Sequence, residues 1–146
     1  MMTNDRFKFR VWDVDNKEYH SMDDVINNDG ELGCAAWTVG FIKYRDGLHI
    51  VEQCTGLKDK NGKLIYEGDI LFVQALDWHK KERWDCETIR TYWSVEYKNY
   101  WNHCGFMVFG INRRFHKPLT RTVIFNSEAE VIGNIHQNPE LLKESK

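Results

Sequence analysis

Hydrophobic and polar residues alternate along several short stretches of the chain, which is the pattern of half-buried β-strands. The clearest alternation covers residues 89–98, where Trp93 and Val95 share one parity and Arg90 and Glu96 share the other. Shorter stretches with strand-like patterning lie at 7–11, 18–22, 37–44, 48–55, 70–73, 106–109, 122–125 and 130–135. The pattern therefore predicts a mainly β protein.

Tight turns separate the predicted strands. Asn61-Gly62 is typical of a β-hairpin, because a type I′ turn needs a positive φ at both of its central residues. A second turn at residues 67–69 precedes the apolar strand at 70–73. Short strands joined in this way are typical of a small β-barrel.

Two short helical segments are predicted beside the strands. Residues 23–28 fit a brief capped helical turn. Near the C-terminus, Asn138 suits an N-cap, Pro139 the first helical position and Glu140 the first turn. We therefore expect a short C-terminal helix.

Composition narrows the class of protein. The chain has 146 residues, of which 42% are hydrophobic and 14% aromatic, and its net charge is −2. The aromatic content excludes a disordered chain, and the charge excludes a wholly basic nucleic-acid-binding protein, though not a local basic patch. The length suits one domain with its own hydrophobic core.

The N-terminus and the cysteines predict a cytoplasmic protein. Charged residues begin at Asp5, which leaves no apolar core for a signal peptide, and no apolar run is long enough to span a membrane. The cysteines show no Cys-x-x-Cys spacing, so we expect reduced thiols at Cys34, Cys54, Cys86 and Cys104.

Three blocks of sequence stand out together. The central block, Thr55–Ile70, contains TGLKDKNGK followed by YEGDI. An earlier block is FRVWD at Phe9–Asp13, and a later one is VIGNIHQNPELL at Val131–Leu142. In order and spacing, these blocks resemble the YopX family of phage and prophage proteins over about residues 6–143.

The resemblance implies an origin and a fold. It implies a phage or prophage protein with a single YopX-like domain over residues 1–146 and a variable insertion at about 76–125. Its core is expected to be an SH3-like small β-barrel with additional hairpins and a short C-terminal helix. No catalytic residue comes with the resemblance, so we expect no enzyme and no cofactor.

The most basic part of the chain is a candidate nucleic-acid-binding segment. Residues 112–121 hold four Lys or Arg residues and no acid, with an aromatic ring that could stack on a base. The candidate residues are Arg113, Arg114, Phe115, Lys117 and Arg121. The alternative interpretation is an exposed basic loop balanced by acidic neighbours.

Two tryptophans lie in the most polar segment, residues 77–87. Trp78 and Trp84 are large apolar side chains that need a covering partner, which favours a protein contact, including one in a homo-oligomer. The alternative is that this loop folds back over its own barrel. Trp12 and Trp93 lie in predicted strands and are expected in the core.

The remaining candidates for chemistry lack a motif. The lysine-rich tip of the central block, residues 58–63, is a weak phosphate contact or simply a soluble hairpin turn. No standard zinc spacing and no nucleophile–base pattern occurs among His79, Cys86, His103, Cys104 and His116. We therefore predict no metal site.

These observations favour a non-enzymatic binding or oligomerisation module that acts on a phage or host protein, without a membrane. The alternative is a nucleic-acid-binding small-barrel protein that uses residues 112–121. The sequence does not identify the protein partner.

Overall fold

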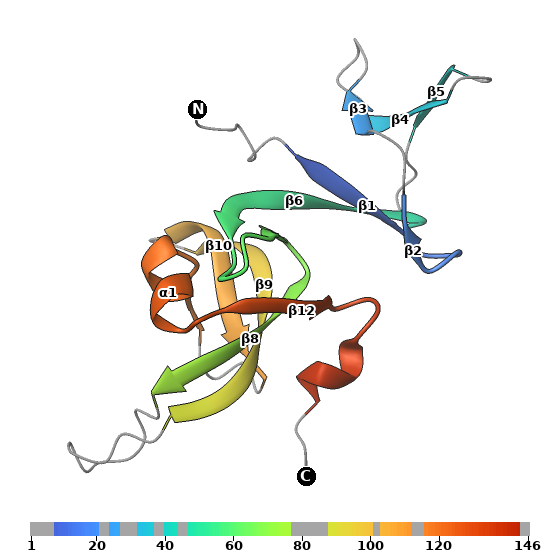
Figure 1. Cartoon of the computed structure of the whole chain (residues 1–146). Coiled ribbons are helices and arrows are strands. Elements are labelled where there is room, and N and C mark those ends of the chain that lie inside the picture. Colours follow the sequence, from blue (N-terminus) through green and yellow to red (C-terminus); the bar gives the residue numbers. More distant parts are fainter. Residues whose placement is uncertain are drawn as a thin grey trace. The chain divides into compact units, whose positions relative to one another are not determined.

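A computed structural model describes residues 8–20, 24–26, 32–36, 40–43, 47–76, 88–100, 103–111 and 116–143. Within the chain, residues 1–54 and residues 55–146 form two compact units, and each is described by itself (Figure 1). The single domain expected over residues 1–146 stays a prediction. Mainly β structure is confirmed.

The N-terminal unit contains two small antiparallel sheets. Its strands are β1 (Phe9–Asp13), β2 (Glu18–Tyr19), β3 (Asp24–Ile26), β4 (Leu32–Ala36), β5 (Gly40–Lys43) and the first part of β6 (His49–Lys58). In one sheet β1 lies between β2 and β6, and in the other β4 lies between β3 and β5. The helical turn predicted at 23–28 is wrong, because β3 pairs with β4 there.

Side chains of the first sheet alternate between its two faces. Val11 is opposite Val51 and Trp12 is opposite Ile50, so these two pairs lie on opposite faces. Val11, Trp12 and Cys54 are buried. Trp12 also contacts Tyr19 edge-on, at 5.1 Å between ring centroids. The core position expected for Trp12 is confirmed.

The C-terminal unit is built around a curled five-stranded sheet (Figure 1). Its elements after β6 are β7 (Leu64–Tyr66), β8 (Asp69–Leu76), β9 (Thr88–Tyr100), β10 (His103–Gly110), β11 (His116–Pro118), α1 (Arg121–Asn126), β12 (Glu130–Asn134) and a 3-10 helix (Pro139–Leu142). The antiparallel sheet has the order β11-β10-β9-β8-β12. The central alternation at 89–98 thus forms the middle strand.

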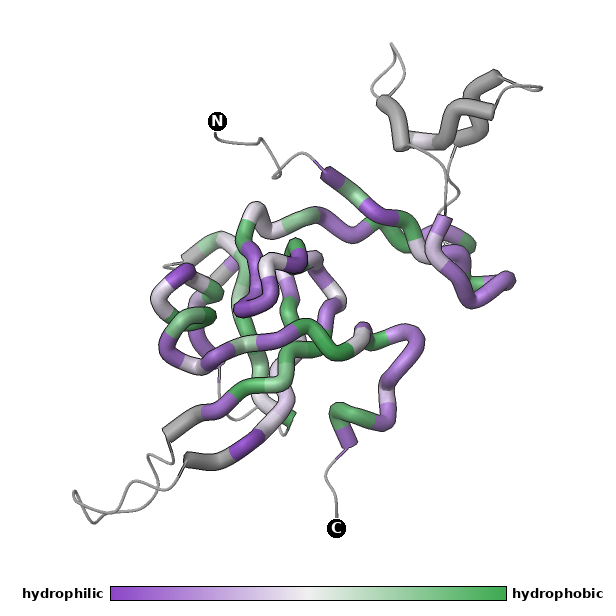
Figure 2. Tube along the Cα trace, viewed as in Figure 1, coloured by the Kyte–Doolittle hydropathy of each residue, from purple (hydrophilic) through white to green (hydrophobic). Residues whose placement is uncertain are grey.

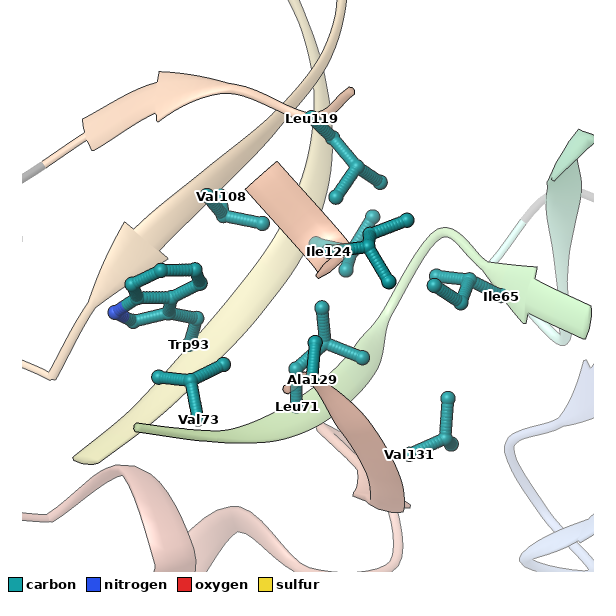
Figure 3. Packing of buried hydrophobic residues seen from close by; sticks show 10 residues of the cluster. Ile65, Leu71, Val73, Trp93, Val108, Leu119, Ile124, Ala129 and Val131 are labelled. Atoms are coloured by element: carbon teal, nitrogen blue, oxygen red, sulfur yellow. The ribbon is translucent and has the colours of Figure 1, made fainter. Parts of the chain in front are cut away.

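One hydrophobic cluster fills the concave side of this sheet (Figure 3). Its members come from β7, β8, β9, β10, α1, β12 and the segments that flank α1: Ile65, Leu71, Val73, Trp93, Val95, Val108, Leu119, Ile124, Ala129 and Val131. The hydrophobic stretches of the central strands are visible in Figure 2. Trp93 is only 2% exposed, so its predicted core position is confirmed.

The prediction of a strand at 122–125 is wrong, because these residues form α1. The Thr120 side chain accepts a hydrogen bond from the Val123 backbone N–H and caps the helix. Ile124 then points into the core, and Ser127 Oγ donates to the Val123 carbonyl at 2.6 Å. Capping and packing override the β-propensity of this short run.

The C-terminal helix is not confirmed in the form expected. Pro139 lies at the start of the 3-10 helix, but the Asn138 side chain makes no capping hydrogen bond. The segment is one tight turn, held by a 3.1 Å bond from Leu141 N to Asn138 O.

The hairpin predicted at Asn61-Gly62 is confirmed, with a different turn. Of these two residues, only Gly62 has a positive φ, of 85°, and Gly62 N donates to Asp59 O at 3.0 Å. This is the type I turn with a following left-handed glycine, in place of a type I′ turn. Asp59 was expected on an exposed tip but is buried. Its carboxylate is satisfied there by backbone hydrogen bonds that it accepts from Asn61 and Lys63.

Candidate functional site

The predicted site residues fall partly outside the described part of the chain. Trp78, Trp84, Arg113, Arg114 and Phe115 all lie outside the described residues. Lys117 and Arg121 are described, on β11 and at the start of α1.

Lys117 packs against the core strand of its own sheet. Its ammonium lies 4.4 Å from the centroid of the Trp93 ring, the geometry of a cation–π contact. Burial lowers the pKa of Lys117. The side chain of Lys117 is therefore engaged in packing against its own sheet.

The exposed side of α1 carries an unusual side chain. Phe125 is 83% exposed, the highest exposure among the large hydrophobic residues that the structure describes. Arg121 lies four residues earlier, which places both side chains on the same side of the helix, and it too is exposed. Glu128, exposed in the turn that follows, has a φ of 46°. We call Arg121, Phe125 and Glu128 the α1 face.

Sequence reasoning identified Arg121 but missed the rest of the α1 face. Phe125 was assigned to a strand, where alternation would have placed it beside the core. The signal that could have revealed it is Thr120, an N-cap residue directly before a short apolar run. With a helical period, Ile124 faces inward and Phe125 outward.

Of the metal or nucleophile set considered from sequence, the two members whose side chains the structure describes, Cys104 and His116, are not brought together. Cys104 Sγ lies 2.8 Å from the Tyr97 hydroxyl, a contact that raises the pKa of Tyr97. His116 stacks on Phe109, at 5.9 Å between centroids. Because Phe109 and Cys104 are five residues apart on β10, His116 and Cys104 are separated by about 17 Å along the ladder. His79 and Cys86 lie outside the described residues.

A different group of metal-ligating side chains lies in the N-terminal unit. Asp13, His20 and His49 offer one ligand atom each, and these atoms all lie within 4.8 Å of one another. The backbone N–H of Asn16 donates to Asp13 and holds the pKa of that carboxyl below its ordinary value. No sequence spacing marks this group, because strand pairing assembles it.

Among the described residues, no helix has both the length and the apolar character needed to cross a membrane.

Comparison with curated proteins gives no significant match. The crystal structure of protein EF1440 from Enterococcus faecalis is similar, with a TM-score of 0.59 and 26% sequence identity, covering 93% of this chain and 97% of that chain. A sequence model described as YopX protein matches residues 8–143. Because this match covers nearly the whole chain, the protein belongs to the YopX family.

Proposed function

We propose that this protein is a non-enzymatic oligomerisation module, and that its contact surface is the α1 face. The partner is a second copy of the same chain. The observation that carries the proposal is the 83% exposure of Phe125 on a helix that Ile124 anchors in the core.

Burial of the Phe125 side chain between two copies of the chain would stabilise a dimer. Complete burial of an exposed Phe side chain contributes about 1.5–3 kcal/mol. In a two-fold contact the same patch meets itself, so the two Phe125 rings would cover each other. An aromatic pair adds about 0.5–1.5 kcal/mol beyond burial alone.

The charges around Phe125 are self-complementary. Arg121 lies on one side of the ring in sequence and Glu128 on the other, and both are exposed. A two-fold axis near Phe125 would bring Arg121 of one copy towards Glu128 of the other. Opposite charges at the rim of an interface favour one register and one partner.

Several broader expectations support this role. The curled sheet and the β6–β7 hairpin are compatible with an SH3-like small barrel, a scaffold suited to presenting a short helix. We also propose a phage or prophage origin, which the family resemblance implies, and a location in the bacterial cytoplasm. The α1 face offers a ring and two opposite charges, which suit contact with a macromolecule better than bond-making.

Sedimentation equilibrium of wild type and Phe125→Ser tests the proposal. Wild type should show a concentration-dependent dimer, and Phe125→Ser should be monomeric with unchanged circular dichroism. Ile132→Ser is the matched control, because Ile132 on β12 is also an exposed hydrophobic residue, at 39%. A monomeric wild type, or a dimer that survives Phe125→Ser, would contradict the proposal.

Nucleic-acid binding is the second candidate function. Two exposed side chains on one side of α1 support it: the cation of Arg121, the last residue of the basic segment 112–121, and the ring of Phe125. Fluorescence anisotropy with a single-stranded oligonucleotide at low and moderate salt tests it. Salt-dependent binding that Arg121→Glu weakens and Lys117→Met leaves unchanged would favour this function over self-association.

A further inference from the structure

The N-terminal unit gathers three metal-ligating side chains from three separate segments. Asp13 ends β1, His20 directly follows β2, and His49 begins β6. Their ligand atoms lie within 4.8 Å of one another, and all three side chains are half-buried. Two imidazole nitrogens and one carboxylate oxygen form a donor set suited to a divalent transition-metal ion.

Strand pairing explains why the three side chains converge. Asp13 and His49 are directly opposite each other in the β1–β6 ladder and therefore share a face of the sheet. His20 N donates to Val11 O at 2.9 Å, which extends the β2–β1 pairing to His20. The His20 and His49 rings then lie 5.2 Å apart, centroid to centroid.

Asn16 holds the carboxylate in place. Its backbone N–H donates to Asp13 Oδ1 at 2.8 Å, and its side-chain amide donates to Asp13 Oδ2 at 3.0 Å. Hydrogen-bonded partners of this kind orient the carboxylates that bind metals in proteins. The β1–β2 turn thus fixes one ligand before any ion is bound.

The distances fit ligands of one ion better than a direct hydrogen bond. His20 Nε2 and Asp13 Oδ2 are 3.7 Å apart, beyond the range of about 2.7–3.2 Å for an N–H···O bond. Two ligands of one tetrahedral zinc ion are separated by about 3.3–3.5 Å, given metal–ligand bonds of about 2.0–2.2 Å. A small inward movement of the three side chains would therefore complete the site.

We propose that Asp13, His20 and His49 bind one zinc ion in the N-terminal unit. Three protein ligands leave a fourth position for water or for a group of a bound partner. The ion would tie β1, β2 and β6 together in a unit of only 54 residues, a size at which metals commonly supplement a small core. This site is independent of the α1 face.

Zinc binding to the untagged full-length chain tests this proposal. After chelator dialysis, the protein is titrated with ZnCl₂ in competition with a chromophoric chelator. Wild type should bind one zinc ion per chain, and His20→Gln or His49→Gln should lower the affinity at least about 100-fold, because even outer-shell changes cost about 10–100-fold. Asn16→Ala should lower the affinity about 10-fold.

His136→Gln is the matched control, since His136 lies outside the cluster. It should bind zinc like wild type. Because a ligand variant could fail to fold, NMR of wild type provides a second measurement: zinc should shift the ring resonances of His20 and His49 before those of the other histidines. No bound zinc, equal affinity in the ligand variants, or first shifts at other histidines would overturn the proposal.

Discussion

The carboxylate of Asp59 accepts a 3.0 Å hydrogen bond from the backbone N–H of Val131, which lies 72 residues later in the chain. The other oxygen of the same carboxylate accepts backbone hydrogen bonds from Asn61 and Lys63 in the hairpin turn. One buried side chain therefore fixes the turn after β6 and joins it to β12. Asp59 of the central sequence block therefore has a structural role.

Replacement of Asp59 should destabilise the C-terminal unit. Asp59→Asn removes one acceptor oxygen and the charge, and a buried N–H left without a partner costs about 1–3 kcal/mol. Chemical denaturation measures the loss, and amide hydrogen exchange at Val131 should accelerate in parallel. Lys58→Ala, at an exposed neighbour, should stay within about 0.5 kcal/mol of wild type. Unchanged exchange at Val131 would contradict this role.

Loss of the α1 N-cap should lower the free energy of unfolding more than substitution of an exposed residue within α1. The Thr120 side chain accepts the Val123 N–H at 3.2 Å, so Thr120→Ala should cost about 1 kcal/mol of unfolding free energy. Thr122→Ala is the control, because Thr122 is exposed within the same helix and makes no cap. Equal effects of the two substitutions in urea denaturation would argue against the cap.

The stability of the N-terminal unit should depend on the two partners of its buried Glu52 side chain. Glu52 is 2% exposed; its Oε2 lies 2.6 Å from Arg10 Nε and accepts a 2.9 Å hydrogen bond from the Tyr19 hydroxyl. Arg10→Met would leave a buried carboxylate without its cation and should cost about 3 kcal/mol, whereas Tyr19→Phe should cost about 1 kcal/mol. Thermal denaturation that ranks Tyr19→Phe as the more damaging change would refute this account.

Lys117 gives a pH-dependent prediction. Burial disfavours its charged form while the Trp93 ring favours it, and we expect burial to dominate because lost hydration of an ammonium exceeds the attraction of one ring. The folded-state pKa then lies below the ordinary value of 10.5, so the unfolded chain binds more protons between the two values. Wild type should therefore gain stability relative to Lys117→Met as the pH rises from 7 towards 10. A relative loss would show that the ring dominates.

Periodicity predicted most strands because it reports which face of a strand is buried. The alternation around Trp93 and Val95 identified the middle strand of the sheet, and both residues are in the core. The same reasoning failed at 122–125, where the hydrogen bond from the Val123 N–H to the Thr120 side chain and the packing of Ile124 favour a helix over a strand. Hydrophobic periodicity is assessed over several residues and does not report a single local hydrogen bond.

The proposed functional surfaces were harder to predict than the fold. Arg121 was identified from a run of basic residues, but Phe125 emerged only once that segment was helical. Asp13, His20 and His49 share a face through strand register, which no spacing along the chain encodes. Lys117 was identified from the same basic run, which carries no sign of its packing against Trp93.

A charge-swap experiment on the α1 face tests whether this face forms a two-fold contact between two copies of the chain. Arg121→Glu and Glu128→Arg should each weaken dimerisation at least about 10-fold, because a two-fold contact repeats each like-charge pair twice. An acidic residue at the start of α1 suits the helix dipole, so Arg121→Glu should fold normally. Sedimentation equilibrium of the double variant Arg121→Glu/Glu128→Arg is the decisive measurement. Dimerisation restored to near the wild-type level is the predicted result, and a double variant weaker than either single variant would contradict it.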